Sequence, residues 1–253
     1  MRGRALSIYA ACALAFLHVP LLILIVFSFN ASRFTVWEGF SLNWYRAAMN
    51  DPQLSEGLVN SVIIAVVAAS LSTFIGTLAA YGIWRRRDTV LSGSLYLSLV
   101  TPEIVTGVSL LALFQWAFRF LHPRLGISTV IIAHVAFSIA YVAIVISARL
   151  RNYDRALEEA AMDLGATEWH AFSRVTLPSL APAIAAAGLL ALVVSFDDYV
   201  ITSLVAGVDS QTLPMVIYAM ARRGVSPVVN AVSALIVVAF GVIILISQRL
   251  QKS

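Results

Sequence analysis

The sequence has 253 residues, of which 60% are hydrophobic and 12% are charged, and its formal net charge is +4. The mean hydropathy is +0.89, and an ordinary soluble domain carries about twice this charged fraction. The apolar residues fall in blocks of about twenty or more, the length at which a helix crosses the bilayer core. We therefore predict an all-α, polytopic membrane protein with one membrane domain over residues 1–253.

Several kinds of chemistry are disfavoured by residue counts. The one cysteine, Cys12, has no partner in the chain for a disulfide. The one lysine, Lys252, follows Gln251 and not the glycine of a GxxxxGK[ST] phosphate loop, so we expect any ATP to be hydrolysed by another protein. We expect no metal site and no cofactor, because no metal-ligand spacing connects the four histidines, His18, His122, His134 and His170.

Six apolar runs are predicted to be transmembrane helices. The first is too long for a signal-peptide core and lacks a small-residue cleavage site, so we expect it to be retained. The third contains Pro102, Glu103 and Gly107, which predict a broken helix. The polar, aromatic segment 30–57 suits an interfacial loop, and residues 207–224 form a second polar loop. The six runs are residues 6–29, 58–84, 91–120, 127–148, 181–206 and 225–247.

Charge distribution predicts the orientation of these helices. Six spans put both termini on one side, and eleven of the 17 Lys and Arg residues fall on that side. The positive-inside bias then places both termini, and the charged segment 149–180, in the cytoplasm. This orientation already accounts for the basic composition, so no nucleic-acid partner is needed; the expected surroundings are membrane lipid.

Residues 159–178 read EAAMDLGATEWHAFSRVTLP and form a charged island between apolar runs. Gly165 suits a left-handed cap that ends a first short helix, and Thr167 can cap a second. We expect Leu177-Pro178 to stop the second helix. A partner protein can approach the tip closely, because the tip residues are small; an amphipathic loop lying on the membrane is the alternative. The tip residues are Ala160, Ala161, Gly165 and Ala166.

The motif Glu159-Ala160-Ala161, then Gly165 after three intervening residues, and finally Leu177-Pro178 resembles the EAA loop of ABC importer permeases. Val175 stands where that family usually has Ile. In the family this loop forms coupling helices that sit in a groove of the ATPase subunit. The resemblance implies a cytoplasmic coupling loop at about 149–180, in which Ala160, Ala161 and Gly165 dock on the ATPase and Glu159 helps to hold the loop.

The resemblance extends over essentially the whole chain and is to the C-type permease subunit of spermidine/putrescine importers. It implies a type I ABC importer permease fold of six transmembrane helices, which is not itself an enzyme and sits in the bacterial cytoplasmic (inner) membrane. The segments that carry it are Phe27-Ser28-Phe29-Asn30, Trp37-Glu38-Gly39-Phe40-Ser41, Trp44-Tyr45, Pro102-Glu103-Ile104-Val105, Ser195-Phe196-Asp197-Asp198 and Gly224-Val225-Ser226-Pro227.

The implied partners are two copies of an ATP-binding ABC subunit, a paralogous B-type permease and an extracytoplasmic polyamine-binding protein. One alternative is the same machine for another solute, such as ferric iron, an opine or thiamine. A less favoured alternative is a secondary cation transporter, which would not need the segment at 159–178. A membrane-embedded enzyme has least support, since no Ser/His pairing or metal set occurs at a usable spacing.

Three acids lie inside apolar runs, where each costs about 2.5–3.5 kcal/mol on insertion scales, so they should face a polar cavity or a partner. A cavity lined by Glu103, Asp197 and Asp198 suits a cationic substrate. The alternative is that these acids hydrogen-bond across helices or to the partner permease. Adjacent helix positions point about 100° apart, so only one of the paired aspartates should face a narrow path. Candidate cation–π contacts are Tyr199, Tyr141 and Trp116.

Overall fold

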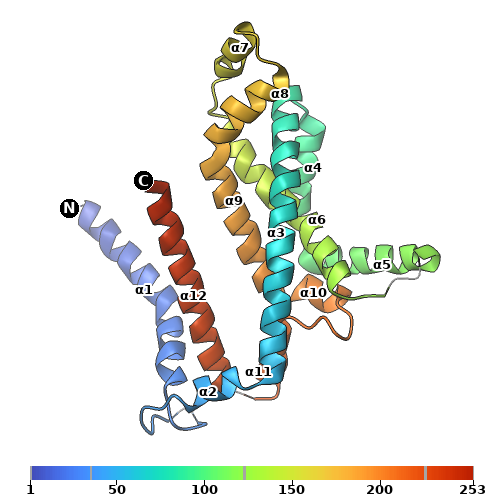
Figure 1. Ribbon diagram of the computed structural model, residues 1–253. Helices are drawn as coiled ribbons and strands as arrows, with labels where there is room; N and C mark the ends of the chain where they lie inside the picture. Colours follow the sequence, from blue (N-terminus) through green and yellow to red (C-terminus); the bar gives the residue numbers. More distant parts are fainter. Residues whose placement is uncertain (1, 35, 122–123, 225–226, 253) are drawn as a thin grey trace. The chain divides into compact units, whose positions relative to one another are not determined.

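The computed structural model describes residues 2–34, 36–121, 124–224 and 227–252 (Figure 1). Parts of the predicted turn at 122–126 and of the segment 224–227 therefore lie outside the described residues. The described chain is helical, and its β-structure is limited to an isolated bridge between Asn30 and Phe40. The all-α prediction is confirmed.

Twelve α-helices and one π-helix, η1, follow one another along the described chain. They are α1 (Arg2–Ser28), α2 (Asn43–Met49), α3 (Pro52–Arg86), α4 (Thr89–Val100), α5 (Glu103–Leu121), α6 (Ile127–Leu150), α7 (Ala156–Asp163), α8 (Glu168–Ala171), η1 (Phe172–Thr176), α9 (Leu177–Asp197), α10 (Val200–Val205), α11 (Leu213–Arg222) and α12 (Pro227–Lys252).

Four helical segments of the described chain are long and apolar enough to cross a membrane, and α4 with α5 would make a fifth. The C-terminal helix α12 has 26 residues, and its stretch Pro227–Val242 is apolar but shorter than these four segments. A multi-pass membrane protein is thus confirmed, while six spans stays a prediction. The four segments are Leu6–Ser28, Pro52–Arg86, Ile127–Leu150 and Glu168–Asp197.

The predicted break in the third apolar run is present, and its cause is local. The axes of α4 and α5 differ by 106°. Thr101, between them, is extended, with φ −66° and ψ 126°, because the ring of Pro102 disfavours a helical conformation at the preceding residue. Glu103 is therefore the first residue of a new helix.

Two expectations about the fifth apolar run are wrong. Leu177-Pro178 does not stop a helix, because α8 passes through η1 directly into α9, and the whole segment Glu168–Asp197 is one apolar span. Pro178 lies in the first turn of α9, where a missing amide hydrogen costs little. The run is also not one helix as far as residue 206, because Asp198 is extended, with φ −65° and ψ 126°, and α10 begins afresh at Val200.

The chain divides into two compact units, residues 1–55 with 216–253, and residues 56–215. In the first unit α1 and α12 run antiparallel side by side, and α2 contacts α12 (Figure 1). The start of α1 and the end of α12 consequently lie at the same end of this unit. The loop after α1 is ordered by Asn30, whose Nδ2 donates to the Val36 carbonyl at 2.7 Å and whose carbonyl accepts from Trp44 Nε1 at 2.7 Å.

The second unit contains α3 to α10, in which α6 packs against α9 and α10 against α5. Small residues let its helices approach closely, as is usual in membrane proteins. A Cβ at Gly76 of α3 would lie 2.7 Å from Val142 Cγ1 of α6, and one at Gly188 of α9 would lie 3.1 Å from Thr73 Oγ1 of α3. The central core is Ala69, Ala80, Val142, Ala143, Ile146, Leu150, Leu180, Ala187 and Ala191.

The close contact at Gly76 gives a stability prediction. We expect Gly76→Ala to lower the free energy of unfolding by about 1–3 kcal/mol, because the methyl group overlaps both Val142 and the Ile139 carbonyl. The measurement is the Tm of the detergent-solubilised protein. Gly93→Ala in α4 is the matched control, since that Cβ meets no atom within 4 Å and alanine favours helix. Equal Tm values for the two variants would contradict this packing.

Candidate functional site

A cavity of about 630 Å³ lies within the second unit, between α4, α5, α6, α9 and α10. Five of the six predicted pathway residues line it: Glu103, Tyr141, Asp197, Asp198 and Tyr199. They come from three stretches of sequence, and the breaks before α5 and before α10 bring Glu103 and the aspartates to the same cavity. The sixth, Trp116, is 61% exposed on α5 and does not belong to the lining.

Asp198 lines this cavity, but its carboxylate is already engaged. The side chain is 6% exposed and accepts hydrogen bonds from the Thr202 amide at 2.8 Å and the Thr202 hydroxyl at 2.7 Å. Its Oδ2 also lies 3.4 Å from His134 Nε2. Because Asp198 is extended and lies two residues before α10, its carboxylate can accept from amides in the first turn of that helix, as a capping side chain does.

Asp197 has a different environment although it is the next residue. It ends α9, its side chain is exposed, and it lines the cavity. The two acids therefore divide into one bonded to neighbouring helices and one open to the cavity. Our reason for expecting such a division was wrong, because the two residues are not consecutive positions of one helix; the chain leaves the helix between them.

His134 is a site residue that the sequence analysis missed. It lies on α6, is 1% exposed, and joins three helices. Its Nδ1 lies 2.7 Å from Ser195 Oγ of α9, and its Nε2 lies 2.9 Å from Thr202 Oγ1 of α10. A signal was present in the sequence, because a histidine in an apolar run must find hydrogen-bond partners to offset its burial. The partners themselves are 61 and 68 residues away.

Metal coordination finds no support in the side-chain clusters. Among the residues that the structure describes, no group of three or more His, Cys, Asp and Glu side chains is placed to hold a metal ion. His134 and Asp198 form a two-residue contact with hydroxyl partners. Their arrangement is that of a satisfied polar network.

The charged segment at 159–178 folds as two short helices joined at Gly165. Gly165 has φ +90°, its amide donates to the Met162 carbonyl at 2.9 Å, and the Ala166 amide donates to the Ala161 carbonyl at 3.1 Å. This pair of bonds is a Schellman motif, which requires a left-handed residue at the glycine position. Thr167 caps α8 by accepting from the His170 amide at 3.3 Å. Both predicted caps are confirmed.

The outer surface of this loop is a mixture of small and bulky residues. Of the residues predicted to dock, Glu159, Ala160 and Gly165 are exposed, and Ala161 and Ala166 are half-buried. Leu164 beside them is 90% exposed, and Trp169 is 66% exposed. The loop therefore leaves large apolar side chains exposed beside its small residues.

The acid that fastens the loop is Glu158, which the sequence analysis did not single out. It is 4% exposed, and its carboxylate accepts from the Thr176 hydroxyl and from Tyr81 Oη at 3.4 Å. Glu159, which the resemblance assigned to holding the loop, is exposed and lies 3.6 Å from Arg155 of the preceding turn. The acid within the EAA motif, Glu159, therefore faces outward, and the residue before it, Glu158, holds the loop.

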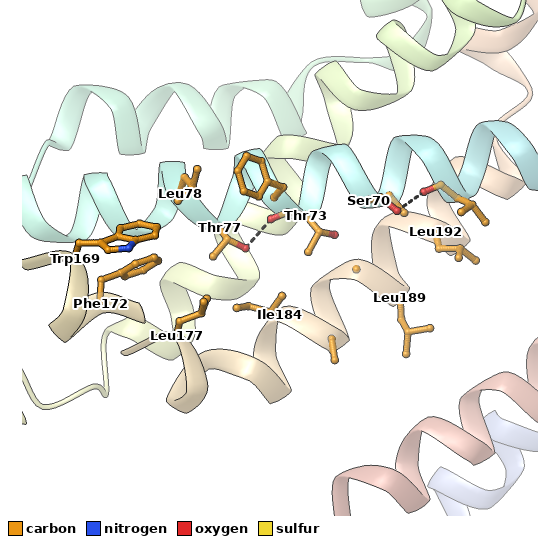
Figure 2. Close-up of a pocket in the computed structure, with 15 residues that line it drawn as sticks. Ser70, Thr73, Thr77, Leu78, Trp169, Phe172, Leu177, Ile184, Leu189 and Leu192 are labelled. Carbon is orange, nitrogen blue, oxygen red and sulfur yellow. Dashed lines mark hydrogen bonds between the residues drawn. The ribbon is translucent and has the colours of Figure 1, made fainter. Parts of the chain in front are cut away.

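An apolar groove of about 580 Å³ runs between α3 and α9 (Figure 2). Figure 2 shows Ile184, Leu189 and Leu192 of α9 along it, with Trp169 and Phe172 at one end. Two of its hydroxyls bond within α3, where Ser70 Oγ donates to the Val66 carbonyl at 2.7 Å and Thr77 Oγ1 donates to the Thr73 carbonyl at 2.6 Å. The hydroxyl of Thr73 is buried without a hydrogen-bond partner among the described residues. The groove therefore offers a hydrocarbon surface.

Solved structures of transporters share this fold. The chain matches a chain of a bacterial ABC transporter involved in the import of the acidic polysaccharide alginate with a TM-score of 0.68, at 17% identity, over 99% of this chain and 94% of that one. It also matches an amino acid ABC transporter with a TM-score of 0.57, at 20% identity, over 81% and 98% of the two chains. The fold is that of an ABC transporter's membrane subunit.

Sequence comparison identifies the family. Residues 72–253 match the model of the binding-protein-dependent transport system inner membrane component, and the chain belongs to this family, as a permease subunit of an ABC importer.

Curated relatives match over most of their lengths. The putrescine transport system permease protein PotI of Escherichia coli (strain K12) is 42% identical over 90% of this chain and 84% of its own. The spermidine/putrescine transport system permease protein PotC of the same strain is 37% identical over 94% and 90%. PotC of Haemophilus influenzae is 37% identical over 94% and 93%. The resemblance to this group of permeases is confirmed.

The His134 network gives a second stability prediction. We expect His134→Leu to lower the free energy of unfolding by about 1–3 kcal/mol, because Asp198, Thr202 and Ser195 each lose a buried partner. Thermal unfolding in detergent measures this loss. His18→Leu, an exposed histidine on α1, is the control and should leave Tm nearly unchanged. A His134→Leu protein as stable as the control would show that the network contributes nothing.

Proposed function

We propose that this chain is the permease subunit of an ATP-driven importer of polyamines in the bacterial inner membrane. The observation that carries the cargo assignment is the cavity in which Glu103 and Asp197 are exposed beside two tyrosines. The names of the relatives PotI and PotC, which concern putrescine and spermidine/putrescine transport, support the same cargo.

The chemistry of the cavity suits a linear cation with apolar spacers. Carboxylates attract ammonium groups, and the faces of Tyr141 and Tyr199 offer cation–π contacts. Asp197 is the primary ammonium contact and Glu103 the second. Asp198 adds negative charge to the wall, while its bonds to Thr202 fix the start of α10 and so the position of Tyr199.

The loop at 159–178 docks on a separate ATPase, of which the importer holds two copies. Ala160, Ala161 and Gly165 form the close contact with the ATPase, and Glu159 lies at the edge of this contact. Leu177 and Pro178 begin α9, the helix to which the movement of the loop is passed. Exposed Leu164 and the glycine cap support this role. Closure of the ATPases on ATP moves the loop, and rigid-body movement of the helices switches access to the cavity. The permease itself performs no hydrolysis.

The remaining partners complete the path. A paralogous B-type permease encloses the cavity from its open side, and a polyamine-binding protein docks on the loops at 30–57 and 207–224. Both termini lie in the cytoplasm, on the side of the coupling loop. The excess of Lys and Arg predicted for that side supports this orientation.

Reconstitution tests this function. We expect proteoliposomes that contain the chain with its ATPase, its second permease and its binding protein to accumulate radiolabelled putrescine or spermidine only when ATP is supplied. Uptake without ATP would indicate a secondary transporter. ATP-dependent uptake of ferric iron, an opine or thiamine in place of polyamine would support an ABC importer but contradict the proposed polyamine cargo.

Charge at Asp197 is expected to set the affinity for cargo. Asp197→Asn should raise the KM for polyamine uptake about tenfold, the change that corresponds to one lost ammonium contact of about 1.4 kcal/mol. Asp197→Glu, which keeps the charge, should stay much closer to the wild-type value. The measurement is initial uptake rate against polyamine concentration at matched membrane levels. An unchanged KM in Asp197→Asn would remove Asp197 from the pathway.

A further inference from the structure

Glu158 lies where three parts of the second unit meet. It belongs to the first turn of α7, in the loop proposed to dock on the ATPase. Its carboxylate accepts from Thr176, the last residue of η1, and from Tyr81 of α3. Thr176 is itself fully buried and also bonds to Tyr153 Oη at 3.2 Å. The side chain of Glu158 therefore links the first loop helix to the junction between the second loop helix and α9.

A short chain of contacts extends from this buried acid to α8. Tyr81 Oη accepts from Arg85 Nη1 at 3.4 Å, and Arg85 Nη2 lies 2.6 Å from Glu168 Oε1 of α8. The Tyr81 ring also packs against Phe172, with centroids 4.5 Å apart. Both loop helices are thus fastened to the same end of α3, and Glu158 is the innermost member of the set.

The junction that Glu158 contacts is a π-helical turn within a long helical segment. A π-helical turn such as η1 has a widened hydrogen-bond pattern and often marks a functional position in an otherwise regular helix. Below it, α9 has 21 residues and is about 31 Å long at 1.5 Å per residue. Asp197 of the cavity is at the far end of this helix. Bending at η1 would absorb a movement of the loop before it reached the cavity.

We propose that Glu158 is the positioning residue that makes α7, η1 and α9 move as one body, so that displacement of the loop reaches the cavity. This inference rests on the proposed coupling function of the loop. Glu159 cannot perform this role, because its exposed carboxylate contacts only Arg155 of its own helix start among the described residues. Glu158 faces inward and contacts the junction directly.

Hydrogen exchange on the purified chain tests whether Glu158 stabilises the π-helical turn η1, and this test does not depend on the cargo. In Glu158→Ala we expect the amides of residues 172–176 to exchange about tenfold faster, because one buried contact of about 1.4 kcal/mol no longer opposes opening of the turn. Thr176→Val should have a similar effect. The double variant should exceed neither single variant by much, since both changes remove the same contact. Glu158→Gln keeps an oxygen acceptor for Thr176 and should stay close to the wild type.

Transport per ATP, measured in the complete complex, tests the consequence of a loosened joint. We expect Glu158→Ala to bind the ATPase in normal yield and to hydrolyse ATP, but to import about tenfold less polyamine per ATP. Glu158→Gln should restore most of the ratio. Asp154→Asn is the matched control: it removes an exposed carboxylate from the same loop and keeps an oxygen to accept from the Ala156 amide.

Three results would overturn the inference. They are unchanged exchange at residues 172–176 in Glu158→Ala, faster exchange with an unchanged transport ratio, and a loss of ATPase binding in parallel with transport. The last would make Glu158 part of the docking surface or of loop stability alone. A wild-type complex that imports no polyamine would contradict the proposed cargo and not the role of Glu158. That role would still be tested by the hydrogen-exchange data and by the transport ratio for the solute that the complex does import.

Discussion

The dominant constraint on this chain is that polar groups within apolar helices must be satisfied by the protein itself. The contact between His134 and the α9–α10 break shows how the constraint is met. Leaving the helix at Asp198 exposes backbone amides, and the Asp198 carboxylate accepts from the Thr202 amide. His134 then holds Asp198 and Thr202 from a third helix. A break that would be costly alone becomes a fixed feature of the cavity wall.

The same constraint explains why two neighbouring aspartates differ in role. One carboxylate is consumed in satisfying the break, which leaves it with little capacity to bind a mobile cation. The other projects from the last turn of α9 into the cavity. Of the two adjacent acids in this apolar run, Asp198 thus stabilises the break between the helices, and Asp197 is open to the cavity.

Local features of the sequence were predictable, and long-range contacts were not. The break at Pro102 and the cap at Gly165 follow from the backbone restrictions of proline and glycine, which act over one or two residues. The prediction that Pro178 ends a helix was wrong. A proline ends a helix where its missing amide hydrogen is needed, but Pro178 lies in the first turn of α9, directly after the π-helical turn. Glu158 and His134 escaped notice because their partners are distant in sequence.

The loop at 159–178 has an outward and an inward face, and the spacing of the motif residues predicts only the outward face. Its small residues and glycine describe a surface that another protein approaches closely. The inward face depends on Tyr81 and Arg85, which belong to the end of α3 and carry no motif of their own. An outward surface can bind an ATPase without moving anything. The proposed coupling also needs a stiff connection to the cavity. The contacts of Glu158, the acid before the motif's own glutamate, and the helical segment Glu168–Asp197 would supply that connection.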